Sequence, residues 1–200
     1  TQTRPVYGSF GARPGIVATL AILDTTTRSA PYDFERLKTF IGARLARLAT
    51  ARRRVVPVPF DLNHPLWVED PHFDVDFHIR RHVLPAPGGE AELAELAGSI
   101  LGIPLDRSRP LWEIHVIEGL ADEGCVALLG KIHHCAVDGV SGAELFVTLF
   151  DLTPEETVAE PPEAPPPERI PTDVELVAHA VLSQARRARV LAHPDLAEAL

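Results

Sequence analysis

Residues 112–132 have the sequence WEIHVIEGLADEGCVALLGKI, in which two strand-like segments flank a polar turn. The first segment, Trp112 to Glu118, alternates Trp, Ile and Val with Glu, His and Ile, and a period of two is typical of a β-strand. The second segment, Cys125 to Ile132, is almost entirely apolar. We therefore expect an antiparallel hairpin whose second strand lies in the middle of a sheet.

Further strands and helices are predicted on both sides of this hairpin. The run GIVATLAIL, Gly15 to Leu23, is apolar and partly β-branched, which indicates a buried strand. Amphipathic helices are expected after a cap at Asp33, over Ala91 to Leu101, and from about Gly142 to Asp151. Their apolar faces contain Leu37, Ile41, Leu45 and Leu48, then Leu93, Ala97, Ile100 and Leu101, then Leu145, Phe146, Leu149 and Phe150. Strands interleaved with helices indicate a mixed α/β domain.

An arginine-rich segment, Arg52 to Pro59, is predicted to form an edge strand, because its two prolines cannot donate ladder hydrogen bonds. The three adjacent arginines, Arg52 to Arg54, are compatible with an ordinary solvated rim and with an anion or phosphate site. Both interpretations stay open at this point.

The composition changes sharply near residue 153. Residues 153–171 are rich in Pro and acidic residues, which predicts an extended linker between a domain over residues 1–152 and a last helix over residues 172–200. Its apolar positions, which could pack on the domain or elsewhere, are Leu176, Val177, Ala180 and Val181. The sequence contains no Met, so we expect a piece of a longer chain or a sequence lacking modified methionines.

The charge balance and cysteine content restrict the function classes. The chain has 200 residues with Lys+Arg 19 against Asp+Glu 28, a formal net charge of −9, which argues against nucleic acid as a partner. Its two cysteines, Cys125 and Cys135, do not form a disulfide framework, so a reducing compartment fits best. We find neither a signal peptide nor an apolar run of about 20 residues, and we expect a cytoplasmic protein.

The chemically informative segment is Lys131-Ile-His-His-Cys-Ala-Val-Asp-Gly139. Two adjacent histidines end a strand, where successive side chains point to opposite faces, so only one of His133 and His134 can face a given cavity. Asp138 is near enough to fix a histidine tautomer or hold the following loop, and Gly139 gives that loop backbone freedom. A neutral imidazole beside an apolar tunnel can serve as a general base toward a hydroxyl group.

Other interpretations of this segment are open. An arbitrary buried pair of histidines is more often structural than chemical. A metal site made by His133, His134 and Asp138 is disfavoured, because adjacent strand residues diverge, and we expect no metal. Cys135 could act as a nucleophile, although it lies in an apolar turn without a CxxC partner.

Three blocks of this sequence resemble a known family. His133 to Gly139 matches HHxxxDG, the signature of the CoA-dependent acyltransferase superfamily that includes chloramphenicol acetyltransferase and the condensation domains of peptide synthetases. Pro104 to Glu113 resembles the PLDxxRPLWE block of bacterial wax ester synthase/acyl-CoA:diacylglycerol acyltransferases, and Phe77 to Arg80 with Leu84 to Gly88 is similar to another block of that family.

The resemblance implies a fold and an activity. The fold would be chloramphenicol-acetyltransferase-like, a two-layer α/β sandwich of a mixed sheet with flanking helices, here as the N-terminal half of a two-domain pseudo-dimer. The activity would be transfer of a long acyl group from acyl-CoA, a co-substrate, to diacylglycerol or a long-chain alcohol, without a bound cofactor. A further C-terminal domain or partner chain would complete the tunnel, with residues 172–200 as the crossover helix.

The resemblance also implies roles for individual residues. His134 would be the general base that deprotonates the acceptor hydroxyl, and His133 would support the site. Asp138 would hold the loop and Gly139 would allow its turn. The substrate-binding residues Pro110, Leu111 and Trp112 would shape the region near the acyl substrate, although Trp112 is equally compatible with a plain core position.

Two rival functions stay open beside this one. The same chemistry could act on a carrier-protein thioester, as in polyketide-associated or condensation-type acyltransferases. The chain could instead be an inactive half-module that requires a partner. Because the expected substrates are lipids, peripheral contact with a membrane or lipid droplet is plausible, with basic patches at Arg52 to Arg54 and Arg186 to Arg189.

Overall fold

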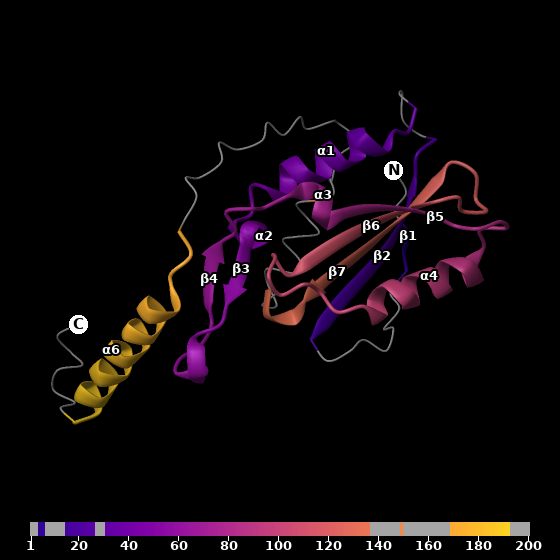
Figure 1. The fold of residues 1–200 in the computed structure, drawn as a ribbon. Coiled ribbons are helices and arrows are strands. Elements are labelled where there is room, and N and C mark those ends of the chain that lie inside the picture. The colour runs from indigo at the N-terminus through magenta and orange to yellow at the C-terminus, as the bar shows by residue number, and fades with distance from the viewer. Residues whose placement is uncertain (1–3, 7–14, 27–30, 137–148, 150–168, 193–200) are drawn as a thin grey trace.

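A five-stranded mixed sheet forms the centre of the protein in the computed structural model, which describes residues 4–6, 15–26, 31–136, 149 and 169–192 (Figure 1). The strand order is β1-β2-β7-β6-β5. The strands are β1 (Arg4–Val6), β2 (Ile16–Asp24), β5 (Ile79–Val83), β6 (Trp112–Glu118) and β7 (Cys125–His133). All neighbours are antiparallel except β5 and β6, which run parallel.

The predicted hairpin is confirmed as β6 and β7, which pair antiparallel with Trp112 opposite Ile132. Its apolar second strand lies at the centre of the sheet between β2 and β6, as expected. The predicted strand over Gly15 to Leu23 is confirmed as β2 and pairs with β7 along its whole length. Both neighbours of β7 therefore begin beside the two histidines, at the end of β7.

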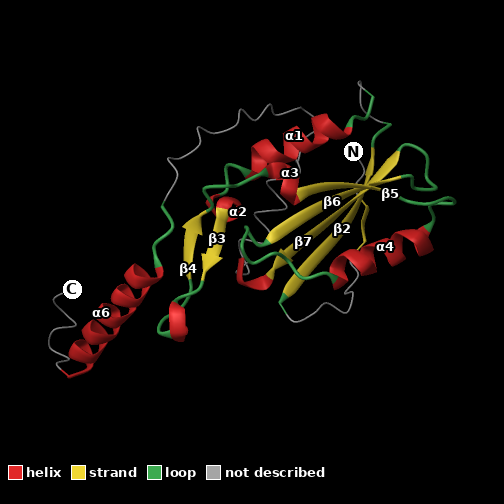
Figure 2. Cartoon of the chain, in the orientation of Figure 1, coloured by secondary structure: helices red, strands yellow, loops and turns green. Residues whose placement is uncertain are grey.

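Helices cover both faces of this sheet (Figure 2). The helices α1 (Phe34–Leu45) and α3 (Val75–His78) lie on one face, and α4 (Glu90–Gly102) lies on the other. Asp33 caps α1 as predicted, because its side chain accepts a hydrogen bond from the backbone N–H of Arg36 at 2.7 Å.

The alternation in β6 separates two hydrophobic cores. Trp112, Ile114 and Val116 pack against the α1 face, whereas Ile117 packs against the α4 face. The predicted core faces of both helices are confirmed: Ile41 and Leu45 from α1 are buried with Leu37 and Leu48 packed around them, and Leu93, Ala97, Ile100 and Leu101 from α4 are buried. The remaining inward positions of β6 on the α4 side are Glu113 and His115, both buried.

A second, smaller sheet lies between the main sheet and the last helix (Figure 1). It contains β3 (Arg53–Val56) and β4 (Leu66–Glu69), preceded by α2 (Ala49–Arg52) and joined through the 3₁₀ turn η1 (Pro59–Asp61). The last helix, α6 (Asp173–Ala192), packs on this sheet. Of its predicted apolar positions, Leu176 and Ala180 are buried against Val56, Val58 and Val68, whereas Val181 is exposed.

The three adjacent arginines are engaged in local contacts. Arg52 and Arg53 form ion pairs with Glu69 on the neighbouring strand, and Arg54 donates to the carbonyl oxygen of Ser108. These contacts connect β3 and the end of α2 to β4, and they connect the small sheet to the loop before β6.

Some predicted elements lie outside the described residues. Of the helix expected from Gly142 to Asp151, only Leu149 is described, and it is buried in the core beside α1. Most of the linker expected over 153–171 also lies outside. Within the described part of the chain, no helix is long and apolar enough to cross a membrane.

Candidate active site

The two histidines occupy the point where β7 ends. His133 is the last residue of the strand, and His134 begins the 3₁₀ turn η2 (His134–Ala136). The N–H of His133 donates to the carbonyl oxygen of Leu111 at 2.9 Å, and the N–H of His134 donates to that of Gly15 at 2.6 Å. Backbone hydrogen bonds to two other segments therefore fix both residues.

His133 is suited to a supporting role. Its ring is half-buried, and its Nδ1 accepts a hydrogen bond from the N–H of Cys135 at 3.2 Å, so the neutral ring carries its proton on Nε2. Burial lowers the pKa of His133, and the charges of Arg107 and His134 lower it further. The ring is therefore neutral near pH 7.

The Nε2 side of the His133 ring lies against Gly15. A Cβ atom at residue 15 would lie 2.9 Å from this nitrogen, and Gly15 has a φ of +100° that other residues rarely adopt. Gly15 therefore makes room for one histidine and provides the carbonyl acceptor for the other. The single sequence holds no signal for this role, because Gly15 is more than a hundred residues away from the motif.

His134 differs from its neighbour in accessibility. His134 is exposed, whereas His133 is half-buried. The two side chains therefore lie in different surroundings, as expected for adjacent residues at the end of a strand. An exposed imidazole can reach a hydroxyl group of a second molecule. The other two predicted site residues, Asp138 and Gly139, lie outside the described residues.

Pro110, Leu111 and Trp112 are brought next to this site and are all buried. The Trp112 indole Nε1 donates to the carbonyl oxygen of Ala51 at 2.7 Å, and its ring stacks on His78 with centroids 4.4 Å apart. These contacts give Trp112 a core role. Trp112 also lines the pocket described next.

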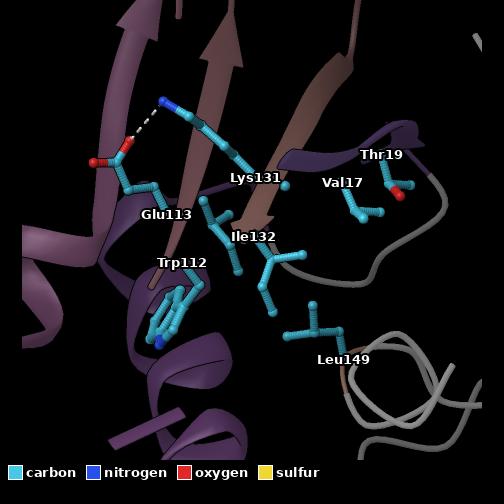
Figure 3. A pocket seen from close by; sticks show the side chains of 9 residues that line it. Val17, Thr19, Trp112, Glu113, Lys131, Ile132 and Leu149 are labelled. Atoms are coloured by element: carbon cyan, nitrogen blue, oxygen red, sulfur yellow. Dashed lines mark ion pairs between the residues drawn. The ribbon is translucent and has the colours of Figure 1, made fainter. Parts of the chain in front are cut away.

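An apolar pocket lies on the α1 face of the sheet, and its lining includes Ile132, the residue directly before the two histidines (Figure 3). Its lining comes from β2, β6 and β7 and from Leu149, and consists of Val17, Thr19, Trp112, Glu113, Ile114, Gly130, Lys131, Ile132 and Leu149. In Figure 3 the side chains of Glu113 and Lys131 lie on one side of the strands and those of Trp112, Ile132 and Leu149 on the other. The pocket surface is therefore mainly hydrocarbon.

A cysteine nucleophile has little support at this site. Burial raises the pKa of the Cys135 thiol, which works against a thiolate nucleophile. Among the described residues, no three His, Cys, Asp or Glu side chains lie close enough together to hold a metal ion.

Comparison with known proteins identifies relatives over most of the chain. The sequence profile of the family described as the wax ester synthase/diacylglycerol acyltransferase catalytic domain matches residues 11–194. Two proteins of Mycobacterium tuberculosis H37Rv, provisionally named diacylglycerol O-acyltransferases, are 40% identical over 156 residues and 43% identical over 149 residues. These alignments cover 78% and 74% of this chain but 31% of each relative, so the chain spans about a third of their length.

Solved structures give the same grouping. The wax ester synthase/diacylglycerol acyltransferase from Marinobacter aquaeolei VT8 superposes with a TM-score of 0.59 at 32% identity, over 90% of this chain and 43% of that one. The starter condensation domain of rhizomide synthetase superposes with a TM-score of 0.53 at 11% identity, over 70% of this chain and 32% of that one. The second likeness concerns the fold alone, and it agrees with the chloramphenicol-acetyltransferase-like fold expected from the sequence.

Proposed function

The chain belongs to the wax ester synthase/diacylglycerol acyltransferase family, and on that premise we propose that it carries the general base of an acyl-CoA-dependent O-acyltransferase. The base is His134. The observation that carries the proposal is the pairing of an exposed His134, held by its backbone to Gly15, with a neutral, half-buried His133 at the end of β7, directly after Ile132, which lines an apolar pocket.

The reaction requires one proton acceptor and no enzyme nucleophile. The imidazole of His134 takes the proton of the acceptor hydroxyl as its oxygen attacks the thioester carbonyl of acyl-CoA. The new C–O bond forms, the C–S bond breaks, and the thiolate of CoA takes the proton from the imidazolium. The ester and CoA leave, and the histidine is neutral again.

The substrates follow from the pocket and from the relatives. The apolar surface formed by Trp112, Ile132 and Leu149 would contact part of the hydrocarbon chain of a long acyl group, since apolar burial is its main source of binding free energy. The pocket itself is too small to enclose the whole chain. The names of the relatives mention diacylglycerol and wax esters, and the acceptors that fit these products are diacylglycerol and a long-chain alcohol. Pro110 and Leu111, buried directly before the pocket residue Trp112, would shape the region near the acyl substrate.

The remaining site residues have supporting roles in this proposal. Neutral His133 keeps the turn in place, Asp138 holds the following loop, and Gly139 allows its conformation. The domain over residues 1–152 carries these groups, and α6 leads toward a further domain or partner chain that completes the acyl tunnel. The reaction takes place in the cytoplasm at the surface of a membrane or lipid droplet, where both acceptors reside.

The test is His134→Ala in the protein expressed at the full length that its gene encodes. With palmitoyl-CoA and diacylglycerol as substrates, we expect kcat to fall about 10²- to 10⁴-fold, because general-base catalysis contributes that much. His64→Ala, which removes an exposed histidine on the small sheet's connecting loop, is the control and retains turnover. Acyl transfer near the wild-type rate in His134→Ala would show that His134 is not the base.

The donor distinguishes this function from its nearest rival. Palmitoyl-CoA and a palmitoyl-loaded acyl carrier protein are offered to the same preparation at equal concentration. Preference for acyl-CoA supports the proposal. A strong preference for the carrier would replace it with a condensation-type reaction.

A further inference from the structure

A cluster of charged and titratable side chains is buried under α4, on the side of β6 and β7 opposite the pocket. Glu113 is 6% exposed, His115 3% and Lys131 1%. Glu113 and Lys131 are direct cross-strand partners in the β6–β7 ladder. The general-base reaction uses none of these groups.

Contacts connect every member of this buried cluster. The Lys131 ammonium lies 3.7 Å from Glu113 Oε2, and His115 Nε2 donates to the same oxygen at 3.2 Å. His115 Nδ1 then accepts a hydrogen bond from His82 Nε2 at 2.9 Å. Arg80 approaches the other carboxylate oxygen at 3.4 Å.

Lys131 also ties the strand to the end of α4. Its ammonium donates to the carbonyl oxygen of Ile100 at 3.0 Å and to that of Ile103, the C-cap of the helix. Cations are favoured at this end of a helix, where carbonyl groups lack intrahelical partners. The loop that begins at Ile103 leads to Leu111, whose carbonyl oxygen binds the N–H of His133.

The cluster therefore contacts both segments that meet at His133, the end of β7 and the start of β6. Lys131 lies two residues before His133 on the same side of β7, and Glu113 lies two residues after Leu111 on β6. Burying an ion pair costs desolvation, and apolar residues of similar volume often stabilise a fold as well or better. A role in geometry explains the cluster better than a role in stability alone.

We propose that Lys131 and Glu113 are positioning residues, which hold the His133–His134 turn in the geometry for acyl transfer by fixing the end of β7 against α4 and the loop before β6. This proposal rests on the proposed function for its kinetic readout. The backbone order of the turn can be measured separately, without an activity assay.

The variants are Lys131→Met, Glu113→Gln and the two combined. Each single change leaves one buried group with fewer partners and is expected to destabilise the fold. The double variant removes both charges while it keeps the side-chain volumes, so it is expected to fold and serves as the main test. We expect its kcat to fall about 100-fold, as for misplacement of a reacting group, with KM for palmitoyl-CoA within about threefold of wild type.

Glu118→Gln is the matched control. Glu118 lies on the same strand as Glu113 and forms an ion pair with Arg81 at 2.7 Å, and its carboxylate accepts a hydrogen bond from the Tyr32 hydroxyl at 2.7 Å. It lies on the opposite face of the sheet, at the far end of β6 from the histidines. Its loss is expected to lower the free energy of unfolding without lowering kcat.

The second readout is hydrogen exchange at the backbone amides of His133 and His134, measured by NMR. We expect exchange at both amides to rise roughly tenfold in the double variant and to stay at the wild-type rate in Glu118→Gln. Unchanged exchange, an unchanged kcat, or equal kcat losses in the double variant and in Glu118→Gln would each overturn the proposal. If His134→Ala remains active, the proposed base is wrong, and the exchange result still decides whether this cluster orders the turn.

Discussion

The backbone N–H of His134 donates a hydrogen bond to the carbonyl oxygen of Gly15, with 2.6 Å between nitrogen and oxygen. Gly15 immediately precedes β2, whose first residue, Ile16, pairs with His133. Gly15 thus contacts both histidines. Its carbonyl oxygen accepts the hydrogen bond from His134, and its lack of a side chain leaves room for the ring of His133.

Gly15→Ala is therefore expected to damage the site. The new methyl group would lie 2.9 Å from the His133 ring at a φ of +100°. Backbone strain of this kind costs about 1–3 kcal/mol, and we expect that loss in the free energy of unfolding measured with urea. We also expect turnover to fall, because the ring of His133 must move.

Gly98→Ala is the control substitution, because a methyl group at this helical position meets no other atom. Gly98 lies exposed in the middle of α4, and no atom lies within 4 Å of a Cβ built there. Replacing a helical glycine with alanine is expected to stabilise the protein by about 0.5–1 kcal/mol. Equal effects of the two substitutions would contradict the packing of His133 against Gly15.

Trp112→Phe tests the core role of the indole. The variant keeps a ring beside His78 but loses the 2.7 Å hydrogen bond from Nε1 to the carbonyl oxygen of Ala51. A buried carbonyl left without its donor costs about 1–3 kcal/mol, and thermal or urea unfolding measures the loss. Trp67→Phe, at a position 41% exposed, should change stability by less than about 0.5 kcal/mol.

Stability is expected to fall in mild acid because of His78. Its Nδ1 lies 2.7 Å from the carbonyl oxygen of Trp112, and burial lowers its pKa below the ordinary value of 6.5. His78 therefore binds a proton more readily in the unfolded chain than in the folded protein. The stability that neutral His78 contributes is complete above pH 6.5 and is lost as the pH falls from there toward the lowered pKa of the folded state.

Urea unfolding at a series of pH values measures this effect. One such group changes the free energy of unfolding by at most about 1.4 kcal/mol per pH unit. The pKa values of His82 and His133 are lowered by burial as well, so they add to the slope. His78→Phe should lower stability at every pH and reduce the slope, and an unchanged slope would contradict the assignment to His78.

Leu176→Ala is expected to release α6 from the small sheet. Leu176 is 3% exposed and packs on Val56, Val58 and Val68. Truncating a buried leucine costs about 2–5 kcal/mol, and we expect the loss to increase hydrogen exchange and proteolysis within α6. Val174→Ala, on the same helix but 79% exposed, is the control and should leave both unchanged.

Local patterns in the sequence were sufficient for the longer helices and strands, whereas the short elements β1, α2, β4, α3 and β5 were not predicted. The period of two in residues 112–118 and the apolar run that follows predicted the β6–β7 hairpin, and the spacing of Leu93, Ala97, Ile100 and Leu101 predicted the buried face of α4. These signals lie within one element, where the geometry of the backbone converts spacing into a shared face. The motif containing His133 and His134 was likewise visible as a string of residues.

Only the tertiary structure decided how distant residues meet at the site. The hydrogen bond between His134 and Gly15, and the buried contacts of Lys131 with Glu113 and the end of α4, join segments far apart in the chain. Helical or strand periodicity says which face of an element is apolar but not which element will cover it. The sequence thus determined the elements and the chemical groups, and long-range packing determined their register, because contacts across strands form only when the whole sheet is assembled.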